Sequence, residues 1–278
     1  LSNFIKYKRN YDLCLVANGA SFENSEVIKM AKELGVPFNT YEKFAFKNAR
    51  TITHQGPFHE FYDLDILLKL LRDNKNTYNK IKLKVKEKAH KLLLERKNST
   101  GKYWGWEYQK KSEQETVTKK WLLQNTKNKE FVLICPNVPF DAGYSSLNLI
   151  FKSMKQWLLD TIRYILKNSN LIVVVRSHPA EDRESFGNEK TDLIIQKSKI
   201  NSKRLIVIPS SSDLNTYELM ENCKFGCVYS STTGVEMAMF GKLVLSGANI
   251  YHSRVGITKK VSDLNSYFNN IKKFINKK

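Results

Sequence analysis

Four consecutive hydroxyl residues at positions 230–233 form the part of the sequence best suited to bind an anion. They follow a short apolar run at 226–229, and after Gly234 apolar residues recur at helical spacing, so we predict a strand, a polar turn and a helix. The first turn of a helix carries unpaired N–H groups and a partial positive charge, which favour a phosphate. Glu236 lies one turn further along and could reach a ribose hydroxyl.

The same residues also fit a structural role. A Ser or Thr at this position can cap a core helix, and Glu236 can then be the acidic residue that stabilises the first turn through the helix dipole. The pattern at 230–236 leaves both interpretations open, and other parts of the chain have to decide between them.

Three further polar features come directly after predicted strands. They are Glu42, the loop that contains Asp141, and the loop at 176–181. In open α/β sheets, ligands bind outside the carboxyl ends of the strands. We therefore expect these three features and the hydroxyl turn to converge on one cleft.

The elements that would position these residues follow an alternating α/β pattern. A strand at 12–17, a helix at 23–34 that stops at Gly35 and a strand at 36–41 form a β-α-β unit, whereas 43–59 is unassigned. From residue 131 onward, strands and helices alternate several times, with a clear central strand at 171–175. We predict two Rossmann-like domains facing across a cleft: residues 1–128, with a reduced sheet and a basic helical linker, and residues 129–278.

The charge of the chain is strongly basic and unevenly distributed. The 278 residues carry a net charge of +19, and the segment 72–130 alone has 17 Lys and Arg against 7 Asp and Glu. Such an excess favours an anionic partner, although a solvated helical face without a partner would have the same composition. No apolar run approaches the roughly 20 residues that span a bilayer.

The four cysteines and the first residues of the chain indicate the cellular compartment that we expect. The spacing of Cys223 and Cys227 is not that of a paired metal knuckle, and we predict that all four cysteines are reduced core thiols of a cytosolic protein. The start of the sequence has no signal-peptide pattern. Because the first residue is Leu1 rather than Met, we also consider the interpretation that the chain is a fragment.

Several stretches together resemble one enzyme family. They are VVVRSHPAE at 173–181, VIPSSSDLNTYELM at 207–220, YSSTTGVEMAMFGKLVL at 229–245 and GIT at 256–258. These stretches look like the capsule polysaccharide biosynthesis group, which comprises glycosyltransferases of GT-B architecture related to the retaining β-Kdo transferases. NVPFDAGY at 137–144 and the pair at 41–42 resemble loops of the same group. The resemblance covers most of 12–45 and 131–262 and is weak across 46–128.

The resemblance implies a CMP-activated donor, with CMP-Kdo expected, held by the second domain without a metal or another cofactor. The residues implied to bind the nucleotide are Arg176, His178, Pro179, Ser230, Ser231, Thr232 and Glu236. Arg176 or Lys242 could offset the charge of the phosphate or the sugar carboxylate. Each role has a structural alternative: His178 could cap a turn, and either cation could simply lie on the surface.

Retention of configuration implies two carboxyl groups with different roles. Asp141 is the candidate nucleophile and Glu42 the candidate acid/base. Alternatively, Asp141 stabilises a turn beside Gly143, and Glu42 is a surface residue. The implied partners are the nucleotide sugar, a glycan or glycolipid acceptor and an anionic membrane, with no nucleic acid, and the implied location is cytoplasmic, peripheral to the membrane.

Two other functions remain open from the sequence. A UDP-sugar 2-epimerase would use the same fold on UDP-N-acetylhexosamine without an acceptor. A basic nucleic-acid-binding protein would account for the charge and the aromatic residues, although the basic excess lies in the linker and no nucleic-acid-binding signature is present.

Overall fold

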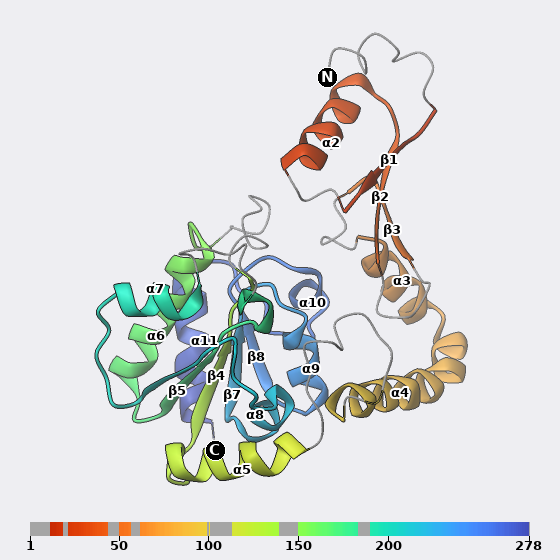
Figure 1. The fold of residues 1–278 in the computed structure, drawn as a ribbon. Helices are drawn as coiled ribbons and strands as arrows, with labels where there is room; N and C mark the ends of the chain where they lie inside the picture. Colours follow the sequence, from red (N-terminus) through yellow and green to blue (C-terminus); the bar gives the residue numbers. More distant parts are fainter. Residues whose placement is uncertain are drawn as a thin grey trace. The chain divides into compact units, whose positions relative to one another are not determined.

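The computed structural model describes residues 12–18, 22–43, 50–56, 62–98, 100, 113–138, 150–182 and 190–277. Its elements divide into two compact units, of which the first takes the described residues through Ala89 and the second takes those from His90 onward (Figure 1). The division thus falls within a helix, well before the predicted boundary at 128/129. We describe each unit by itself.

The first unit contains a small mixed sheet with one helix packed on it. Its elements are β1 (Cys14–Ala17), α2 (Phe22–Leu34), β2 (Phe38–Lys43), β3 (Arg50–His54), α3 (Tyr62–Asp73) and the first part of α4 (Lys75–Lys97). β1 and β2 are parallel, as the predicted β-α-β unit requires, and β3 is antiparallel to β2. α2 buries Ile28 and Ala31 against Val16 and Phe38 to form a small apolar core. β3 lies in the segment that the sequence left unassigned.

The second unit is built on a parallel sheet of five described strands. They are β4 (Phe131–Cys135), β5 (Ile172–Arg176), β6 (Leu205–Ile208), β7 (Phe225–Val228) and β8 (Leu243–Ser246). The spatial order is β6-β5-β4-β7-β8, so that the first strand of the unit lies between the second and the fourth. This order is that of a Rossmann-like doubly wound sheet, and it confirms the predicted fold for this half of the chain.

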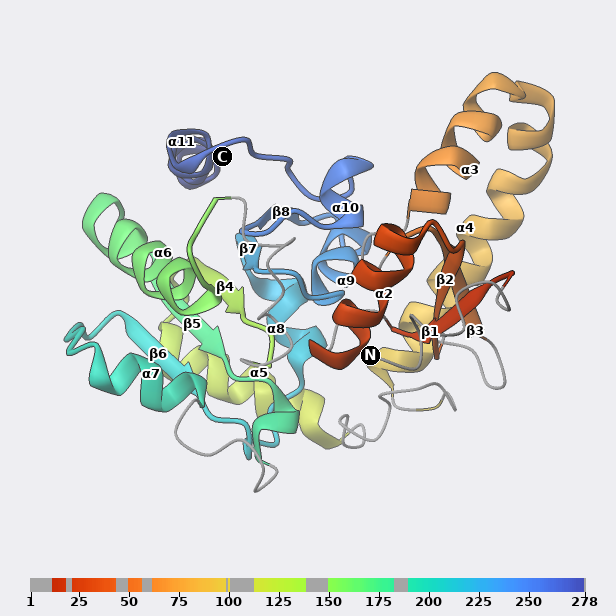
Figure 2. The same ribbon diagram turned by 90° about the horizontal axis from the view of Figure 1, so that it is seen from above.

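Helices cover both faces of this sheet, which is why its strands are apolar at consecutive positions (Figure 2). The core on one face includes side chains of α6 (Met154–Asn168), α7 (Thr191–Lys197) and α11 (Leu264–Asn276). The core on the other face includes side chains of α5 (Glu113–Thr126), α8 (Thr216–Asn222) and α9 (Thr233–Met239). A 3₁₀ turn, η6 (Pro179–Asp182), and the short α10 (Tyr251–Arg254) complete the described elements.

Gly226 in β7 allows α9 to pack directly on the sheet. A Cβ atom at this position would lie 2.1 Å from the sulfur of Met237 in α9. Real Cβ atoms do not approach a neighbour so closely, so a larger residue here would force the Met237 side chain to move. The glycine therefore makes room on β7 for the fully buried side chain of Met237.

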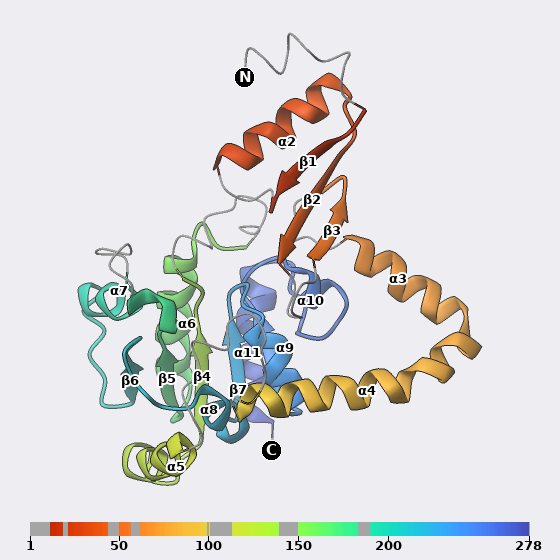
Figure 3. The ribbon, with the colours of Figure 1, turned by 45° about the vertical axis from the view of Figure 1, so that its right-hand side comes forward.

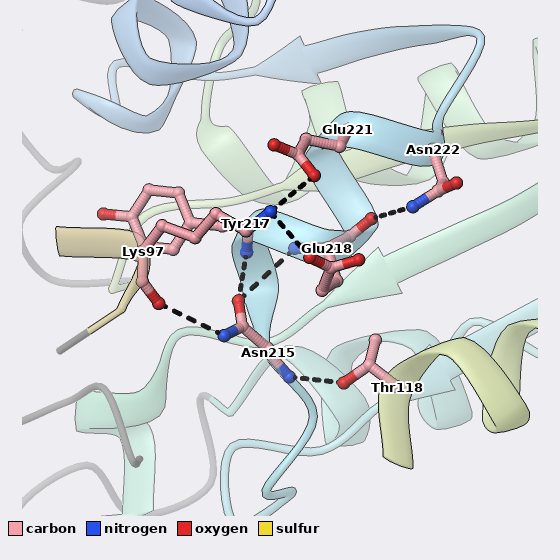
Figure 4. Close-up of polar contacts among 7 residues, drawn as sticks. All are labelled: Lys97, Thr118, Asn215, Tyr217, Glu218, Glu221 and Asn222. Carbon is pink, nitrogen blue, oxygen red and sulfur yellow. Dashed lines mark hydrogen bonds and ion pairs between the residues drawn. The ribbon is translucent and has the colours of Figure 1, made fainter. Parts of the chain in front are cut away.

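A polar network explains why the end of α4 and the whole of α5 belong to the second unit (Figure 4). Asn215 caps α8 by accepting hydrogen bonds from the backbone N–H groups of Tyr217 and Glu218, at 2.9 and 3.3 Å. Its own backbone N–H donates to Thr118 of α5 over 2.8 Å, and its side-chain amide donates to the carbonyl of Lys97 in α4 over 3.4 Å. One asparagine thus connects three helices.

Lys97 adds two ion pairs to the same network. Its ammonium lies 2.8 Å from Glu218 and 2.7 Å from Glu221, and Glu218 is 1% exposed. Burial lowers the pKa of Lys97, but the hydrogen bonds and charges of the two carboxylates outweigh burial and raise it overall. Removing one partner of so buried a pair would leave an uncompensated charge, so that this network fixes the end of α4 to α8.

The cysteines confirm part of the prediction. All four are free, and Cys135, Cys223 and Cys227 are buried, whereas Cys14 is half-buried. Burial raises the pKa of the Cys223 and Cys227 thiols to about 12, which makes them poor nucleophiles. Among the described helices, none is long and apolar enough to cross a membrane.

Candidate functional site

The candidate site lies at the carboxyl edge of the second sheet, where β4 and β7 are neighbours. The chain passes from β4 to β5 on one side and returns at β7 on the other, so this is the point where the strand order reverses. In doubly wound folds, ligands bind at this switch point. The backbone N–H of Ser230, after β7, donates to the side-chain oxygen of Asn137, after β4, over 2.9 Å. The two strand ends are therefore joined directly.

Contacts from the next strand hold the end of β7 in place. The N–H of Gly247 donates to the carbonyl of Val228 over 2.8 Å, and the Ser246 hydroxyl donates to the carbonyl of Tyr229 over 2.8 Å. The Tyr229 side chain is fully buried, with its ring centroid 5.4 Å from that of Trp157. The hydroxyl turn therefore begins from a rigid strand end.

Within the hydroxyl turn, most of the polar contacts are local. Ser231 Oγ accepts hydrogen bonds from the backbone N–H and the hydroxyl of Thr233, at 3.3 and 2.9 Å, so its own proton can be donated elsewhere. Thr232 is exposed, and its side chain makes no capping hydrogen bond to α9. The N–H groups of Gly234 and Val235 donate to the carbonyls of Ser231 and Thr232. The hydroxyls of Ser231 and Thr232, rather than these amides, are thus the groups placed to meet a ligand.

His252 of α10 lies close to Gly234, directly after this turn, and no motif in the sequence pointed to it. It is fully buried, its Nδ1 lies 2.9 Å from the Thr258 hydroxyl, and its buried Nε2 has no hydrogen-bond partner among the residues that the structure describes. Burial lowers the pKa of His252 to about 4, and the nearby carbonyl of Ser231 opposes the shift only in part. A Cβ atom on Gly234 would lie 3.4 Å from the imidazole ring, which shows how closely the helix and the histidine approach.

Glu236 is placed in an ion pair inside the second unit. Its carboxylate lies 3.2 Å from Nε of Arg96 and accepts a hydrogen bond from the Tyr217 hydroxyl over 3.2 Å. Burial raises the pKa of Glu236, whereas Arg96 and Tyr217 lower it to a smaller extent. In this structure the carboxylate thus joins α9 to α4 and α8, and its predicted contact with ribose stays a prediction. Neither Arg96 nor Tyr217 carried a motif that could have revealed this pair.

Arg176 is at the end of β5, but its side chain turns toward the chain itself. The guanidinium donates to the carbonyls of Pro209 and Ser212, and its Nε lies 3.5 Å from the Thr216 hydroxyl. Arg176 is 5% exposed, so it is not the surface cation that the alternative interpretation expected. Burial lowers its pKa, and the contacts tie the end of β5 to the turn after β6.

His178 begins the next turn, which a buried carboxylate organises. Glu181 accepts hydrogen bonds from the N–H of His178 and from the N–H and hydroxyl of Thr191, at 3.1, 2.7 and 2.8 Å. The imidazole of His178 is half-buried, and its Nδ1 accepts a hydrogen bond from the N–H of Ala180 over 3.1 Å. Pro179, the first residue of η6, is also half-buried. This arrangement matches the predicted turn-capping alternative.

The remaining predicted residues are not among those that the structure describes at this edge. Asp141 is outside the described residues. Glu42 is at the end of β2 in the first unit, where its carboxylate accepts a hydrogen bond from the Asn18 side chain over 3.0 Å. Lys242 follows the C-terminal end of α9 and precedes β8, at the opposite end of the helix from the hydroxyl turn. The expectation that Lys242 offsets charge at the carboxyl edge was therefore wrong.

The ends of β5, β4 and β7 lie side by side along the carboxyl edge. Adjacent strands are about 4.8 Å apart, so the ends of β5 and β7 are roughly 10 Å apart. The described part of this edge carries His178 after β5, Asn137 after β4, and Ser230, Ser231 and Thr232 after β7. This polar edge of a Rossmann-like sheet is the candidate site.

Comparison with known proteins does not assign a function to this candidate site. No protein-family model and no curated protein sequence matches the chain. Among solved structures, the chain is similar to Thermosulfurimonas dismutans KpsC, beta Kdo 2,4 transferase, with a TM-score of 0.46 and 12% identity over 91% of this chain and 73% of that chain. It is also similar to the beta Kdo 2,7 transferase of the same KpsC, with a TM-score of 0.30 and 15% identity over 61% and 54%. Similarities this low carry no functional argument, so the function has to be argued from the residues.

Proposed function

We propose that this chain is a glycosyltransferase that transfers a sugar from a CMP-activated donor, with Kdo as the expected sugar, to a glycan or glycolipid acceptor. The observation that carries the proposal is the junction at the sheet switch point, where the Asn137 side chain binds the N–H of Ser230. This junction brings the loops of β4 and β7, two of the segments that resemble the capsule polysaccharide group, to one edge. The donor class itself comes from that resemblance.

The chemistry of this edge suits the phosphate and nucleotide of such a donor. The hydroxyls of Ser231 and Thr232 can donate hydrogen bonds to phosphate oxygens, and His178 Nε2, on the neighbouring loop, can donate another or receive a proton. Because the strand ends are already fixed by backbone contacts, these donors need little reorganisation when the donor binds. We therefore assign Ser230, Ser231, Thr232 and His178 to the donor phosphate.

The transfer itself would use Asp141, four residues beyond Asn137 in the loop that leaves β4. In the first step a carboxylate oxygen of Asp141 bonds to the anomeric carbon, and CMP leaves with the electron pair of the broken C–O bond. In the second step the acceptor hydroxyl attacks the same carbon and displaces Asp141, while its proton passes to Glu42. Two displacements at one carbon retain the configuration of the sugar.

Nucleotide binding tests the first part of the proposal. Isothermal titration with CMP and with UDP should show binding of CMP. Thr232→Val should weaken CMP binding, whereas Thr116→Val, the same substitution at an exposed position of α5, should leave it unchanged. If neither nucleotide binds, the proposal is wrong.

Product analysis tests the reaction. Asp141→Ala should abolish transfer from CMP-Kdo and retain CMP binding, while Asp160→Ala, at a half-buried aspartate of α6 that is paired with Arg163, should retain both. Transfer at the wild-type rate by Asp141→Ala would reject the nucleophile. Conversion of UDP-N-acetylglucosamine to its 2-epimer without an acceptor would instead identify an epimerase.

A further inference from the structure

The first part of α4, in the first unit, is a basic helix with most of its surface in solvent. Between positions 75 and 89 it has six lysines, and Glu87 is the single acidic residue. Nearly all of these residues are exposed, in contrast to the end of the same helix, where Leu93 is buried. The lysines of this stretch therefore face water rather than a core.

An apolar stripe runs along this helix between the lysines. Tyr78, Ile81, Val85 and Ala89 are separated by three, four and four residues, which places them on one face at about 100° per residue. Tyr78 is 48% and Val85 is 58% exposed. The same geometry places Lys82 and Lys86 along one edge of the stripe and Lys84 and Lys88 along the other.

The contacts of Lys82 agree with this arrangement. Its ammonium lies 5.8 Å from the centre of the Tyr78 ring, so the long side chain runs along the edge of the stripe. Lysines beside an apolar stripe can extend along it and keep their ammonium groups in water or at a polar surface. The stripe thus has cations at its border.

The neighbouring helix α3 exposes further apolar residues. Ile66 is 59% and Leu70 is 61% exposed, and these residues are one turn apart. The two helices meet at Asn74, whose side chain caps α4 by accepting from the N–H of Thr77 over 3.1 Å (Figure 3). In the described chain, six of the large exposed apolar side chains lie between positions 66 and 85: Ile66, Leu67, Leu70, Tyr78, Leu83 and Val85.

We propose that α3 and the first part of α4 form the surface by which this protein docks on an anionic lipid bilayer. Apolar side chains on one face with lysines along both edges are the composition of helices that lie in a membrane interface. The apolar groups enter the acyl boundary, and the lysines remain at the headgroups, where each is attracted by the negative surface potential. Neither contribution depends on the reaction, so the inference does not rest on the proposed function.

Charge complementarity favours a bilayer over the other possible occupants. A second copy of the chain would present the same lysines and would repel them at short range. A nucleic acid would satisfy the lysines but would leave the aliphatic stripe of Ile81 and Val85 without a partner. An anionic bilayer accounts for both the charge and the apolar groups.

Co-sedimentation of the full chain with vesicles tests this surface. Binding should be strong to phosphatidylcholine vesicles that contain phosphatidylglycerol, weak to pure phosphatidylcholine, and reduced by salt. Lys82→Gln combined with Lys86→Gln should weaken binding about 30-fold, since each lysine near such a surface contributes about fivefold. The matched control is Lys259→Gln combined with Lys260→Gln, two exposed lysines of the second unit, which should bind like the wild type.

A second pair of variants, one test and one control, examines the apolar stripe of α4. Val85→Ser should weaken vesicle binding several-fold, and Val117→Ser, at a residue of α5 that is 54% exposed, should not. Circular dichroism and CMP titration on each variant show whether the fold and the nucleotide site are retained, so that loss of docking is separate from failure of the proposed function.

Three outcomes would overturn the inference. The first is equal binding to neutral and anionic vesicles. The second is a dimer in sedimentation equilibrium that Val85→Ser dissociates, because the stripe would then be covered by a second copy. The third is tight binding of a random DNA duplex at physiological salt, lost in the Lys82 and Lys86 variant, in the absence of vesicle binding.

Discussion

The loop after β5 and the loop after β7 end at the same edge of one sheet, but they use their polar groups differently. In the β5 loop, Arg176 and Glu181 are buried, and their contacts are with the carbonyls, amides and hydroxyl of neighbouring segments. In the β7 loop, Ser231 and Thr233 bond to each other, and Thr232 is exposed. Charged residues thus shape one loop, and hydroxyl residues are presented by the other.

The difference shows that charge in a sequence motif does not by itself indicate a ligand contact. A buried ion is costly unless its partners are supplied, so the fold surrounds Arg176 and Glu181 with them. Neutral hydroxyls cost little to leave at a surface and can exchange water for a phosphate oxygen. Arg176 and Glu181 therefore form the frame of the edge, and the SSTT stretch supplies the hydroxyls that we propose bind the donor.

The largest expected effect follows from removing the carboxylate that frames the β5 loop. Glu181→Ala leaves three buried donors without an acceptor, and we expect a loss of about 3 to 5 kcal/mol in the free energy of unfolding. Urea denaturation measures this loss. Glu181→Gln keeps the size and one acceptor oxygen and should cost less than half as much. A change below 1 kcal/mol for Glu181→Ala would remove the distinction between the two loops.

Acid should lower the stability of the fold near the β7 loop, through protonation of His252. Because burial lowers the folded pKa of His252 to about 4 from 6.5, the neutral ring contributes stability that is present above pH 6.5 and is lost as the pH falls toward 4. The loss reaches about 3 kcal/mol at 1.36 kcal/mol per pKa unit.

The measurement is the difference in unfolding free energy between pH 7 and pH 4.5 for the wild type and for His252→Gln. The Gln variant should be less sensitive to acid, although it lowers stability at pH 7. His90→Gln, at an exposed histidine of α4 in the second unit, is the control and should show the wild-type pH dependence. Equal acid sensitivity in all three proteins would contradict the assignment.

A smaller effect is expected at Arg176. Arg176→Lys cannot donate to both Pro209 and Ser212 with the geometry of a guanidinium, and we expect a loss of about 2 kcal/mol in stability. The affinity for CMP, measured by titration on the folded variant, should change little. A variant of unchanged stability that has lost CMP binding would show that Arg176 belongs to the binding residues after all.

The smallest effect on stability is expected at Thr232. Thr232→Val removes one exposed hydroxyl without a capping role, so the free energy of unfolding should change by less than about 0.5 kcal/mol. CMP affinity should fall about fivefold, the value of one hydrogen bond. Thr116→Val is the control for both measurements. A large loss of unfolding free energy in Thr232→Val would show that Thr232 stabilises the edge, as Arg176 and Glu181 do.

Much of the second unit could be predicted because its strands are short apolar runs between polar turns. The strands predicted at 171–175 and 226–229 are each displaced by one residue from β5 and β7. The short helices α7 and α10 were not predicted, since four to seven residues carry too little periodicity. β3 was also missed, because its sequence RTITH has one buried residue and no apolar run.

The candidate site could be predicted in outline but not in its contacts. The strand-end rule selected His178 and the hydroxyl turn from the sequence. The rule could not find Asn137, whose single side chain links two strand ends that are 93 residues apart. His252 and Arg96 were missed for the same reason, because a partner from a distant segment leaves no local pattern.

By itself the sequence determined the alternation of strands and helices, the basic stretch between 72 and 130, and the stretches that resemble one glycosyltransferase group. Periodicity and composition are local properties, so that they can be assigned before any fold is known. Only the tertiary structure decided that β7 lies beside β4, that Arg176 and Glu236 are held by the chain, and that Thr232 is exposed. These depend on which segments meet in space, and packing across a sheet is set by the whole chain at once.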